Sequence, residues 1–182
     1  MKRFYISDMH FFHKTIISDC DRPYKSLKEM HNDMIIKWNR KVGKNDMVYI
    51  VGDVATTLKE EELLEVVNIL KMLNGKKTLI IGNHDRESIK NFKFRKCFID
   101  IKEYARIYDG GKRVVIFHCP MECWEGDKKG VIHIHGHIHN ELITNKKNRY
   151  NVSVDARNFE PKTLNELIAE ESYKLLKLKK DA

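Results

Sequence analysis

The sequence contains no apolar run long enough to span a membrane, which predicts a soluble protein that does not bind membranes. Residues 1–4 run straight into a predicted strand and leave no room for a signal peptide, so we expect a cytoplasmic location. Internal repeats, low-complexity tracts and linkers are also missing. The 182 residues are therefore expected to form a single domain, residues 1–182, with a sizeable core.

The four cysteines lack the spacing of a disulfide framework. Cys119 and Cys123 could be mistaken for half of a zinc knuckle, but no second pair of cysteines completes one. We therefore expect reduced thiols, as is usual in cytosolic proteins.

Basic residues outnumber acidic ones, and the net charge of +8 favours an anionic partner. The lysines and arginines are dispersed, and part of the excess lies at helix ends such as residues 177–180. This distribution weakens one reading of the chain, a basic nucleic-acid-binding domain in which a metal is only structural.

Apolar segments and amphipathic patterns alternate in the first half of the chain. Strands are predicted at 2–7, 47–51 and 77–81, and helical spacing of apolar residues is found after Ser26 and from 63 to 73. Ser26 with Glu29 forms a capping box. This alternation is typical of a parallel sheet.

The second half has a different pattern, which predicts a mixed sheet. Residues 98–108 and 112–117 flank Asp109-Gly110-Gly111 and are expected to form a hairpin. Further strands are predicted at 131–134 and 150–154, before a final amphipathic helix that opens near Thr163.

Five predicted strands each end in side chains that commonly bind metals. These are Asp8 and His10, Asp53, Asn83, His118, and His137 with His139. The carboxyl ends of strands form the ligand-binding edge of open α/β sheets. Any one of them alone could be a turn residue or a hydrogen-bonded core histidine, but together they predict a metal centre.

These motifs resemble, in order, the five-motif signature of the calcineurin-like metallophosphoesterases. The matching segments are Asp8-x-His10, Gly52-Asp53, Gly82-Asn83-His84-Asp85, His118 and Gly136-His137-x-His139. The short chain, with Phe11-Phe12-His13 and Arg22-Pro23-Tyr24 near its start, is similar to the small bacterial and phage-type members. The resemblance implies an α/β fold, a four-layer αββα sandwich of two mixed sheets, with a dimetal site at the carboxyl ends of the strands.

The resemblance also implies two divalent metal ions. One would be held by Asp8, His10, Asp53 and His139, and the other by Asp53, Asn83, His118 and His137. Asp53 would bridge both, because two neighbouring cations need a shared anionic oxygen. Imidazoles with few carboxylates suit transition metals, so we expect manganese, with iron, zinc, cobalt or nickel as alternatives.

The implied reaction is hydrolysis of a phosphate ester by in-line attack of a metal-bridging hydroxide. His84 would face the phosphate or the leaving oxygen and would stabilise charge or donate a proton. Residues 52–57 lack the second Asp and the Arg of the protein-phosphatase branch, which argues against a Ser/Thr phosphatase. The usual Asp partner of His84 is thereby missing, and Asp85 is the candidate for that place. The Tyr of the purple acid phosphatase branch is also absent.

Three further residues are candidates outside the ligand set. His13 and Arg22 follow the first motif and could contact a substrate phosphate. The alternative for both is a plain surface role. His135 lies two residues before His137 and could support the ligands, or be a buried, hydrogen-bonded histidine.

We expect a metal-dependent phosphoesterase, and a phosphodiesterase in particular. Arg86 is the only basic residue that directly abuts a motif, a modest supply of fixed charge for a dianionic monoester. A phosphomonoesterase acting on a small phosphorylated substrate is the alternative. A non-catalytic metal-binding scaffold is weaker, because His84 and every ligand are present. Nucleotide and nucleic-acid substrates both stay open, as does the oligomeric state.

Overall fold

The computed structural model describes residues 1–56, 59–141 and 146–180, and its first sheet is parallel throughout. The strand order is β1-β2-β3-β4. The strands are β1 (Arg3–Ile6), β2 (Met47–Val51), β3 (Lys76–Ile80) and β4 (Asp100–Lys102). Crossover helices join the first three, which confirms the predicted alternation and places their carboxyl ends at one edge.

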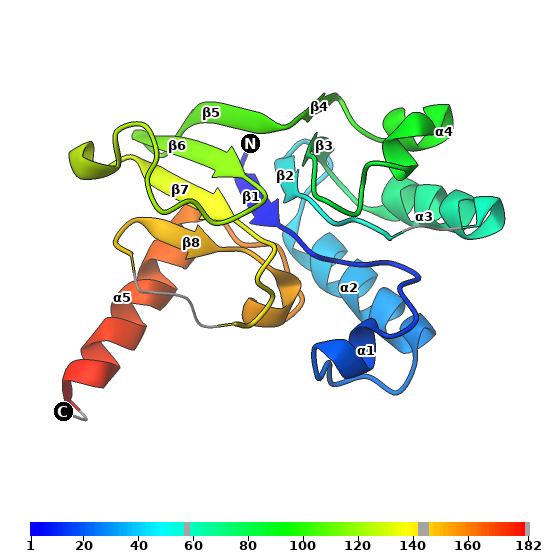
Figure 1. Cartoon of the computed structure of the whole chain (residues 1–182), viewed down its shortest axis with the longest axis horizontal. Coiled ribbons are helices and arrows are strands. Elements are labelled where there is room, and N and C mark those ends of the chain that lie inside the picture. The colour runs from blue at the N-terminus through cyan, green and yellow to red at the C-terminus, as the bar shows by residue number, and fades with distance from the viewer. Residues whose placement is uncertain (57–58, 142–145, 181–182) are drawn as a thin grey trace.

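Two long helices, α2 (Leu27–Lys41) and α3 (Glu60–Met72), pack against one face of this sheet (Figure 1). The Ser26 hydroxyl accepts the Glu29 N–H at 3.2 Å, as the capping box predicts. Trp38 is buried in the apolar cluster between the helices and the sheet. Short elements complete this side: α1 (Ile16–Asp19), the 3-10 helix η1 (Ser88–Lys90) and α4 (Phe92–Arg95).

The second sheet has the order β5-β6-β7-β8 and is mixed. Its strands are β5 (Tyr104–Asp109), β6 (Lys112–Phe117), β7 (Ile132–His135) and β8 (Arg149–Asn151). The predicted hairpin joins β5 and β6, and its turn glycines, Gly110 and Gly111, have φ of +55° and +76°. Two consecutive positive φ angles match the twist of the flanking strands.

The segment predicted as one hairpin arm, 98–108, is in fact two strands in different sheets. β4 pairs with β3, whereas β5 pairs with β6 (Figure 1). The chain therefore passes from the first sheet to the second at Glu103. Sequence pattern alone marks an extended segment and does not show where its pairing partner changes.

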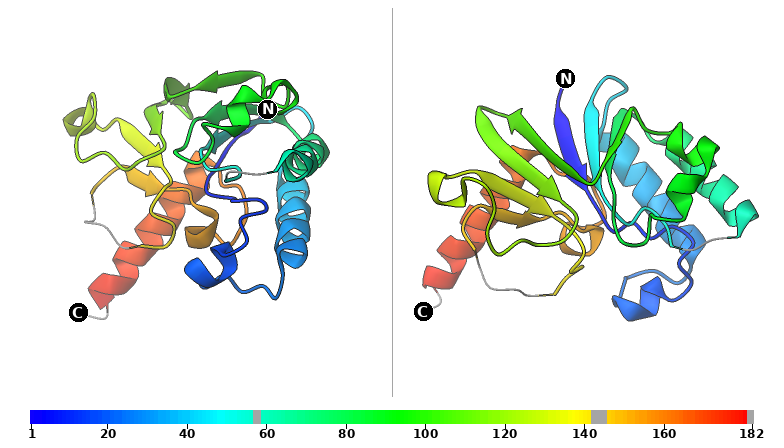
Figure 2. Two further views of the ribbon diagram at one scale, coloured as in Figure 1. Left: turned by 45° about the vertical axis from the view of Figure 1, so that its right-hand side comes forward. Right: turned by 45° about the horizontal axis from the view of Figure 1, so that its top comes forward.

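The two sheets face each other across a second apolar cluster (Figure 2). Tyr5 and Ile80 enter it from the first sheet, Ile116 and Ile134 from the second, and Leu167 from α5 (Leu164–Lys180). The predicted sandwich of two sheets flanked by helices is thus confirmed, and only its second sheet is mixed. Among the described residues, no helix is both long and apolar enough to cross a membrane.

A loop, residues 119–131, covers the outer face of the second sheet. It includes the 3-10 helix η2 (Asp127–Lys129) and the buried Trp124, whose indole N–H donates to Val131 O at 2.9 Å. His133 of β7 lies beneath it, and its Nε2 accepts the Met121 N–H at 3.1 Å. A buried imidazole therefore holds this loop to the sheet.

His133 makes the stability of this region sensitive to acid. Burial lowers its pKa to about 4, whereas an unfolded histidine titrates near 6.5. Between about pH 4 and 6.5 the unfolded state therefore binds more protons than the folded state. The free energy of unfolding should fall as pH drops through this range. One such group contributes at most about 1.4 kcal/mol per pH unit. Urea unfolding of wild type and His133→Gln across this range measures the effect.

The variant should show a shallower pH slope than the wild type. His31, whose pKa burial also lowers to about 4, is present in both proteins, so the difference between slopes isolates His133. Equal slopes in two folded proteins would contradict this assignment.

Candidate metal centre

The structure brings the carboxyl ends of strands from both sheets together. Asp8, Asp53 and Asn83 follow β1, β2 and β3, while His118 follows β6 and His137 follows β7. The carboxylate of Asp53 marks the meeting point. Its Oδ2 lies 3.2 Å from Nε2 of His118 and 3.6 Å from Nε2 of His10. A single oxygen thus contacts histidines from both predicted ligand sets.

The first ligand set, Asp8, His10, Asp53 and His139, is buried more deeply. Candidate ligand atoms of Asp8, His10 and His139 all lie within 4.8 Å of one another. Burial raises the pKa of Asp8 and lowers that of His10 to about 3. Among the described residues, Nε2 of His10 is the one buried side-chain nitrogen or oxygen without a hydrogen-bond partner. A neutral imidazole with an unused nitrogen is what a metal ion requires of a histidine ligand.

The second ligand set, Asp53, Asn83, His118 and His137, centres on an amide oxygen. Asn83 Oδ1 lies 3.0 Å from Nε2 of His118 and 3.1 Å from Nδ1 of His137. Nδ1 of His118 donates to Val51 O at 2.8 Å, which turns Nε2 toward the site. Burial opposes charge on both members of the Asp53–His118 pair. Their hydrogen bond and mutual attraction nevertheless lower the pKa of Asp53 and raise that of His118.

Five of the seven predicted ligands have left-handed backbone conformations. Their φ angles are +57° at Asp8, +50° at His10, +55° at Asp53, +73° at His137 and +49° at His139. Residues other than glycine rarely adopt this conformation, and such strain is concentrated at functional sites. The concentration here supports a functional reading of the strand ends.

Two of the motif glycines, Gly82 and Gly136, are required by close approach to a ligand carboxylate. A Cβ at Gly82 would lie 2.2 Å from Asp53 Oδ1, and one at Gly136 would lie 2.2 Å from Ser7 Oγ. The Gly136 Cβ would also lie 2.4 Å from Asp8 Oδ2. Only glycine allows the backbone this near to both carboxylates.

Asp85 does not act on His84 as the sequence suggested. Its Oδ2 accepts the N–H groups of Asp53 and Gly82 at 2.8 and 2.9 Å, and its Oδ1 accepts that of Val54 at 2.9 Å. Burial raises its pKa to about 6. Asp85 therefore ties together two of the motif loops, a structural role that corrects the catalytic assignment.

His84 has Thr56 as its neighbour instead. Thr56 Oγ1 lies 3.0 Å from Nδ1 of His84. The His84 ring lies 5.1 Å from the ring of His10, centroid to centroid, which places it at the margin of the ligand cluster. Because Nδ1 is engaged, Nε2 is the atom of His84 that is available to a substrate.

His13 lies at the site, whereas Arg22 does not face it. Nδ1 of His13 is 3.3 Å from Nδ1 of His10, and its ring is 6.2 Å from that of His84. The side chain of Arg22 is fully buried and donates to Asp155 and to the carbonyl oxygens of Asp8 and Met9. The expected contact of Arg22 with a substrate phosphate is therefore corrected, because the guanidinium is enclosed behind the first ligand set.

His135 lies on the outer face of the second sheet. Its ring packs 5.3 Å from that of His133, and its Nδ1 is 2.9 Å from Gly136 O. Burial lowers its pKa to about 3. These contacts favour the reading of a buried, hydrogen-bonded histidine over direct support of a ligand side chain.

Asp155 is the main site residue that sequence reasoning missed. It is buried, and its Oδ2 accepts from Nδ1 of His139 at 2.7 Å. Asp155 directly follows the predicted strand 150–154, so it shares the strand-end position of the other candidates. The position of Asp155 directly after a predicted strand is the feature of the sequence that could have identified it as a site residue. Thr56, by contrast, has no feature in the sequence that distinguishes it from other loop residues.

A family comparison agrees with this geometry. The model of the calcineurin-like phosphoesterases matches residues 1–177. The chain belongs to the calcineurin-like phosphoesterase family. An uncharacterized protein of Methanocaldococcus jannaschii, MJ1445, is 34% identical over 175 residues, which cover 92% of this chain and 90% of that protein.

Two further relatives confirm the predicted likeness to small bacterial and phage members of this family. The gene 66 protein of Mycobacterium phage L5 is 27% identical over 180 residues, covering 84% of this chain and 86% of that protein. The crystal structure of AQ665 from Aquifex aeolicus, a protein of unknown function, superposes with a TM-score of 0.70 at 25% identity. That superposition covers 96% of this chain and 98% of the other.

Because the backbone at Gly136 lies so near Ser7 and Asp8, we predict that a larger residue at this position lowers the free energy of unfolding. Gly136→Ala inserts a methyl group against Ser7 and Asp8, and we expect a loss of about 1–3 kcal/mol in the free energy of unfolding. Gly43→Ala is the control, because its Cβ would meet the side-chain carboxylate of Asp46, with Oδ2 at 3.2 Å and Cγ at 3.9 Å, and no backbone atom within 4 Å. Urea unfolding with a chelator present measures both. A Gly136→Ala protein as stable as the control would contradict the packing described here.

Proposed function

We propose that this protein is a dimetal-dependent phosphoesterase that hydrolyses phosphodiesters. The observation that carries the proposal is the position of Asp53 Oδ2 between His10 and His118, beside an otherwise unpartnered Nε2 of His10. An imidazole without a hydrogen-bond partner is costly to bury, and a metal ion bound there would satisfy it.

The donor set fits two metal ions of the transition series. The first ligand set would hold one ion and the second ligand set the other, with Asp53 shared between them. Imidazole, carboxylate and amide donors favour manganese, with iron, zinc, cobalt and nickel as alternatives. When bound, the ions would supply positive charge for the phosphate and activate the attacking water.

The remaining chemistry falls to side chains at the margin of the cluster. His84, held through Nδ1 by Thr56, would donate from Nε2 to a phosphate oxygen or to the leaving oxygen. His13 lies beside it and would contact the same phosphate. Asp8, buried and held by hydrogen bonds from the Ser7 hydroxyl and the His137 N–H, would add its carboxylate to the first metal ion.

The burial of Arg22 strengthens the case for a diester substrate. A monoester carries about two negative charges, and enzymes that bind it commonly supply an arginine fork. With Arg22 enclosed, Arg86 is the exposed basic residue that abuts a motif. A singly charged diester needs less fixed positive charge. The net charge of +8 is compatible with a nucleotide or nucleic-acid diester.

Metal analysis tests the centre directly. We expect two transition-metal ions per chain, with activity lost to chelators and restored by manganese. His84→Ala should keep its metals and lose about 10²-fold in turnover, because it removes a charge-stabilising or proton-donating group. Asp53→Asn should lose both metals and activity, because it weakens both sites at once. Plasma emission and steady-state kinetics give the two readouts.

A wild-type protein without metal, even after manganese is added, would refute the dimetal proposal. Full activity of His84→Ala on every substrate would refute its role while leaving the metal centre in place. Two bound metals without turnover on any phosphate ester would instead identify a non-catalytic scaffold.

Substrate preference is tested by comparing an aryl phosphodiester with the matching monoester. We expect kcat/KM for the diester to equal or exceed that for the monoester in manganese. The His84→Ala protein, purified in parallel, controls for a contaminating phosphatase. A preference for the monoester above about tenfold, or 1.4 kcal/mol of transition-state binding, would recast the protein as a phosphomonoesterase.

A further inference from the structure

Residues 151–155, from the last residue of β8 into the 3-10 helix that follows, hold His139 from two sides. Asp155, in the 3-10 helix η3 (Val154–Ala156), accepts from Nδ1 of His139 at 2.7 Å. Asn151, the last residue of β8, donates from Nδ2 to the backbone oxygen of His139 at 2.7 Å. The ring and the backbone of His139 are therefore fixed by one short stretch of chain. The backbone contact also supports a residue whose φ is +49°.

Arg22 fixes Asp155 in turn. Its Nε and Nη2 donate to the two carboxylate oxygens at 2.8 and 2.9 Å, a bidentate pair. The same guanidinium donates to Asp8 O at 2.7 Å and to Met9 O at 3.0 Å. It therefore joins the loop after β1 to the segment after β8. Attraction to Arg22 and His139 keeps the carboxylate charged despite its burial, and the pKa of Asp155 is lowered.

We propose that Asp155 and Asn151 are positioning residues that hold His139 ready for the first metal ion, with Arg22 locking Asp155 in place. The inference rests on the proposed function and extends it, because it makes the segment after β8 part of the metal centre. A carboxylate on Nδ1–H of a histidine fixes its tautomer and presents Nε2 as the ligand atom. Nδ1 of His139 is taken by Asp155, so Nε2 is left to serve the first ligand set.

An additional metal site at Cys20, His139 and Asp155 is the competing reading. Candidate ligand atoms of these residues lie within 4.8 Å of one another. However, the guanidinium of Arg22 already bonds both oxygens of Asp155, and its charge opposes a second cation there. The geometry therefore favours positioning over a further metal.

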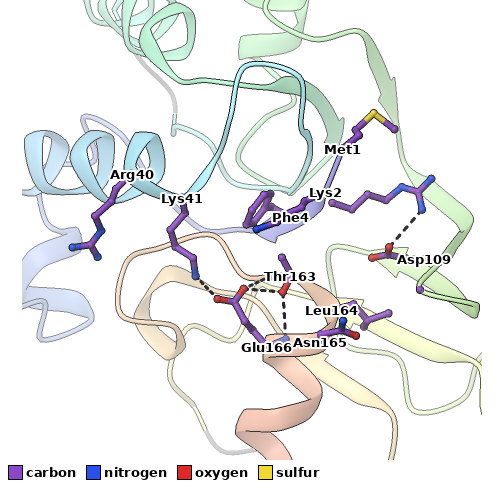
Figure 3. Close-up of a pocket in the computed structure, with 12 residues that line it drawn as sticks. Met1, Lys2, Phe4, Arg40, Lys41, Asp109, Thr163, Leu164, Asn165 and Glu166 are labelled. Atoms are coloured by element: carbon purple, nitrogen blue, oxygen red, sulfur yellow. Dashed lines mark hydrogen bonds and ion pairs between the residues drawn. The ribbon is translucent and has the colours of Figure 1, made fainter.

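Asp109 provides a matched control at the other end of the second sheet. It lines a cavity of about 760 Å³ (Figure 3). Its carboxylate pairs with Arg3 at 3.5 Å and accepts the Tyr5 hydroxyl at 2.7 Å. In the strand register Asp109 faces Lys112, whereas the end of β6 that leads to His118 faces Tyr104. Loss of Asp109 thus removes an arginine-paired aspartate far from the metal centre.

The experiment titrates each purified, metal-free protein with manganese by calorimetry. Asp155→Ala should weaken one of the two binding events by about 10–100-fold and leave the other unchanged. Asn151→Ala should weaken the same event by a smaller factor, because the contact of Asp155 with the ring remains. Asn151→Ala leaves no buried charge unpaired. If Asp155→Ala fails to fold, Asn151→Ala therefore still tests whether this segment positions His139. Asp109→Ala should bind both ions as the wild type does.

A second readout separates positioning from general damage. Excess manganese should restore the turnover of Asp155→Ala and Asn151→Ala, because the weakened step is metal binding. Wild-type metal affinity in both folded variants would overturn the inference and leave the dimetal proposal standing. Three ions in the wild type and two in Asp155→Ala would overturn it in favour of the Cys20 site. No manganese in the wild type would refute the dimetal proposal and this inference together.

Discussion

The burial of two carboxylates, Asp8 and Asp53, at the junction of two sheets is the constraint on which the structure of this site depends. Carboxylates withdrawn from water are costly unless hydrogen bonds or cations compensate them. Asp8 receives Ser7 Oγ at 2.6 Å and the His137 N–H at 3.0 Å. Asp53 receives the His84 N–H at 2.9 Å and faces His118. Nε2 of His10 is left without a hydrogen-bond partner, and the metal ions proposed above would complete the arrangement.

The surrounding backbone is shaped to make those contacts. Left-handed conformations aim side chains of consecutive motif residues at one point, and they persist because the neighbouring chain holds them. Asp85 performs this function for the second and third motifs by binding three N–H groups, those of Asp53, Val54 and Gly82. A residue that looks catalytic by its place in a motif thus serves the loops that carry the ligands.

Features that repeat along the chain could be predicted from the sequence. The alternation of strands and helices, the capping box at Ser26 and the strand-end ligands all depend on local pattern. Pairing between distant segments could not. Arg22 was predicted to contact a substrate phosphate or to lie on the surface, because the sequence gives no sign of its partner, Asp155, 133 positions away. The split of segment 98–108 between two sheets, and the contact of His133 with the loop 119–131, likewise depend on tertiary contacts. The family resemblance predicted the metal ligands, but it did not predict the residues that hold those ligands in place.

The ligand sets also explain why the two sheets must meet at this edge. Asp8, His10, Asp53 and Asn83 come from the first sheet, and His118, His137 and His139 come from the second. Each proposed metal ion would therefore bind residues of both sheets. Binding free energy of that kind is available only to the folded chain and adds to its stability. The Arg22–Asp155 pair makes the same connection without metal, since it joins the loop after β1 to the segment after β8. These protein contacts bring the ligand-bearing ends of the two sheets together without metal. The proposed metal ions would therefore bind to side chains that are already close to one another, and little ordering would oppose their binding.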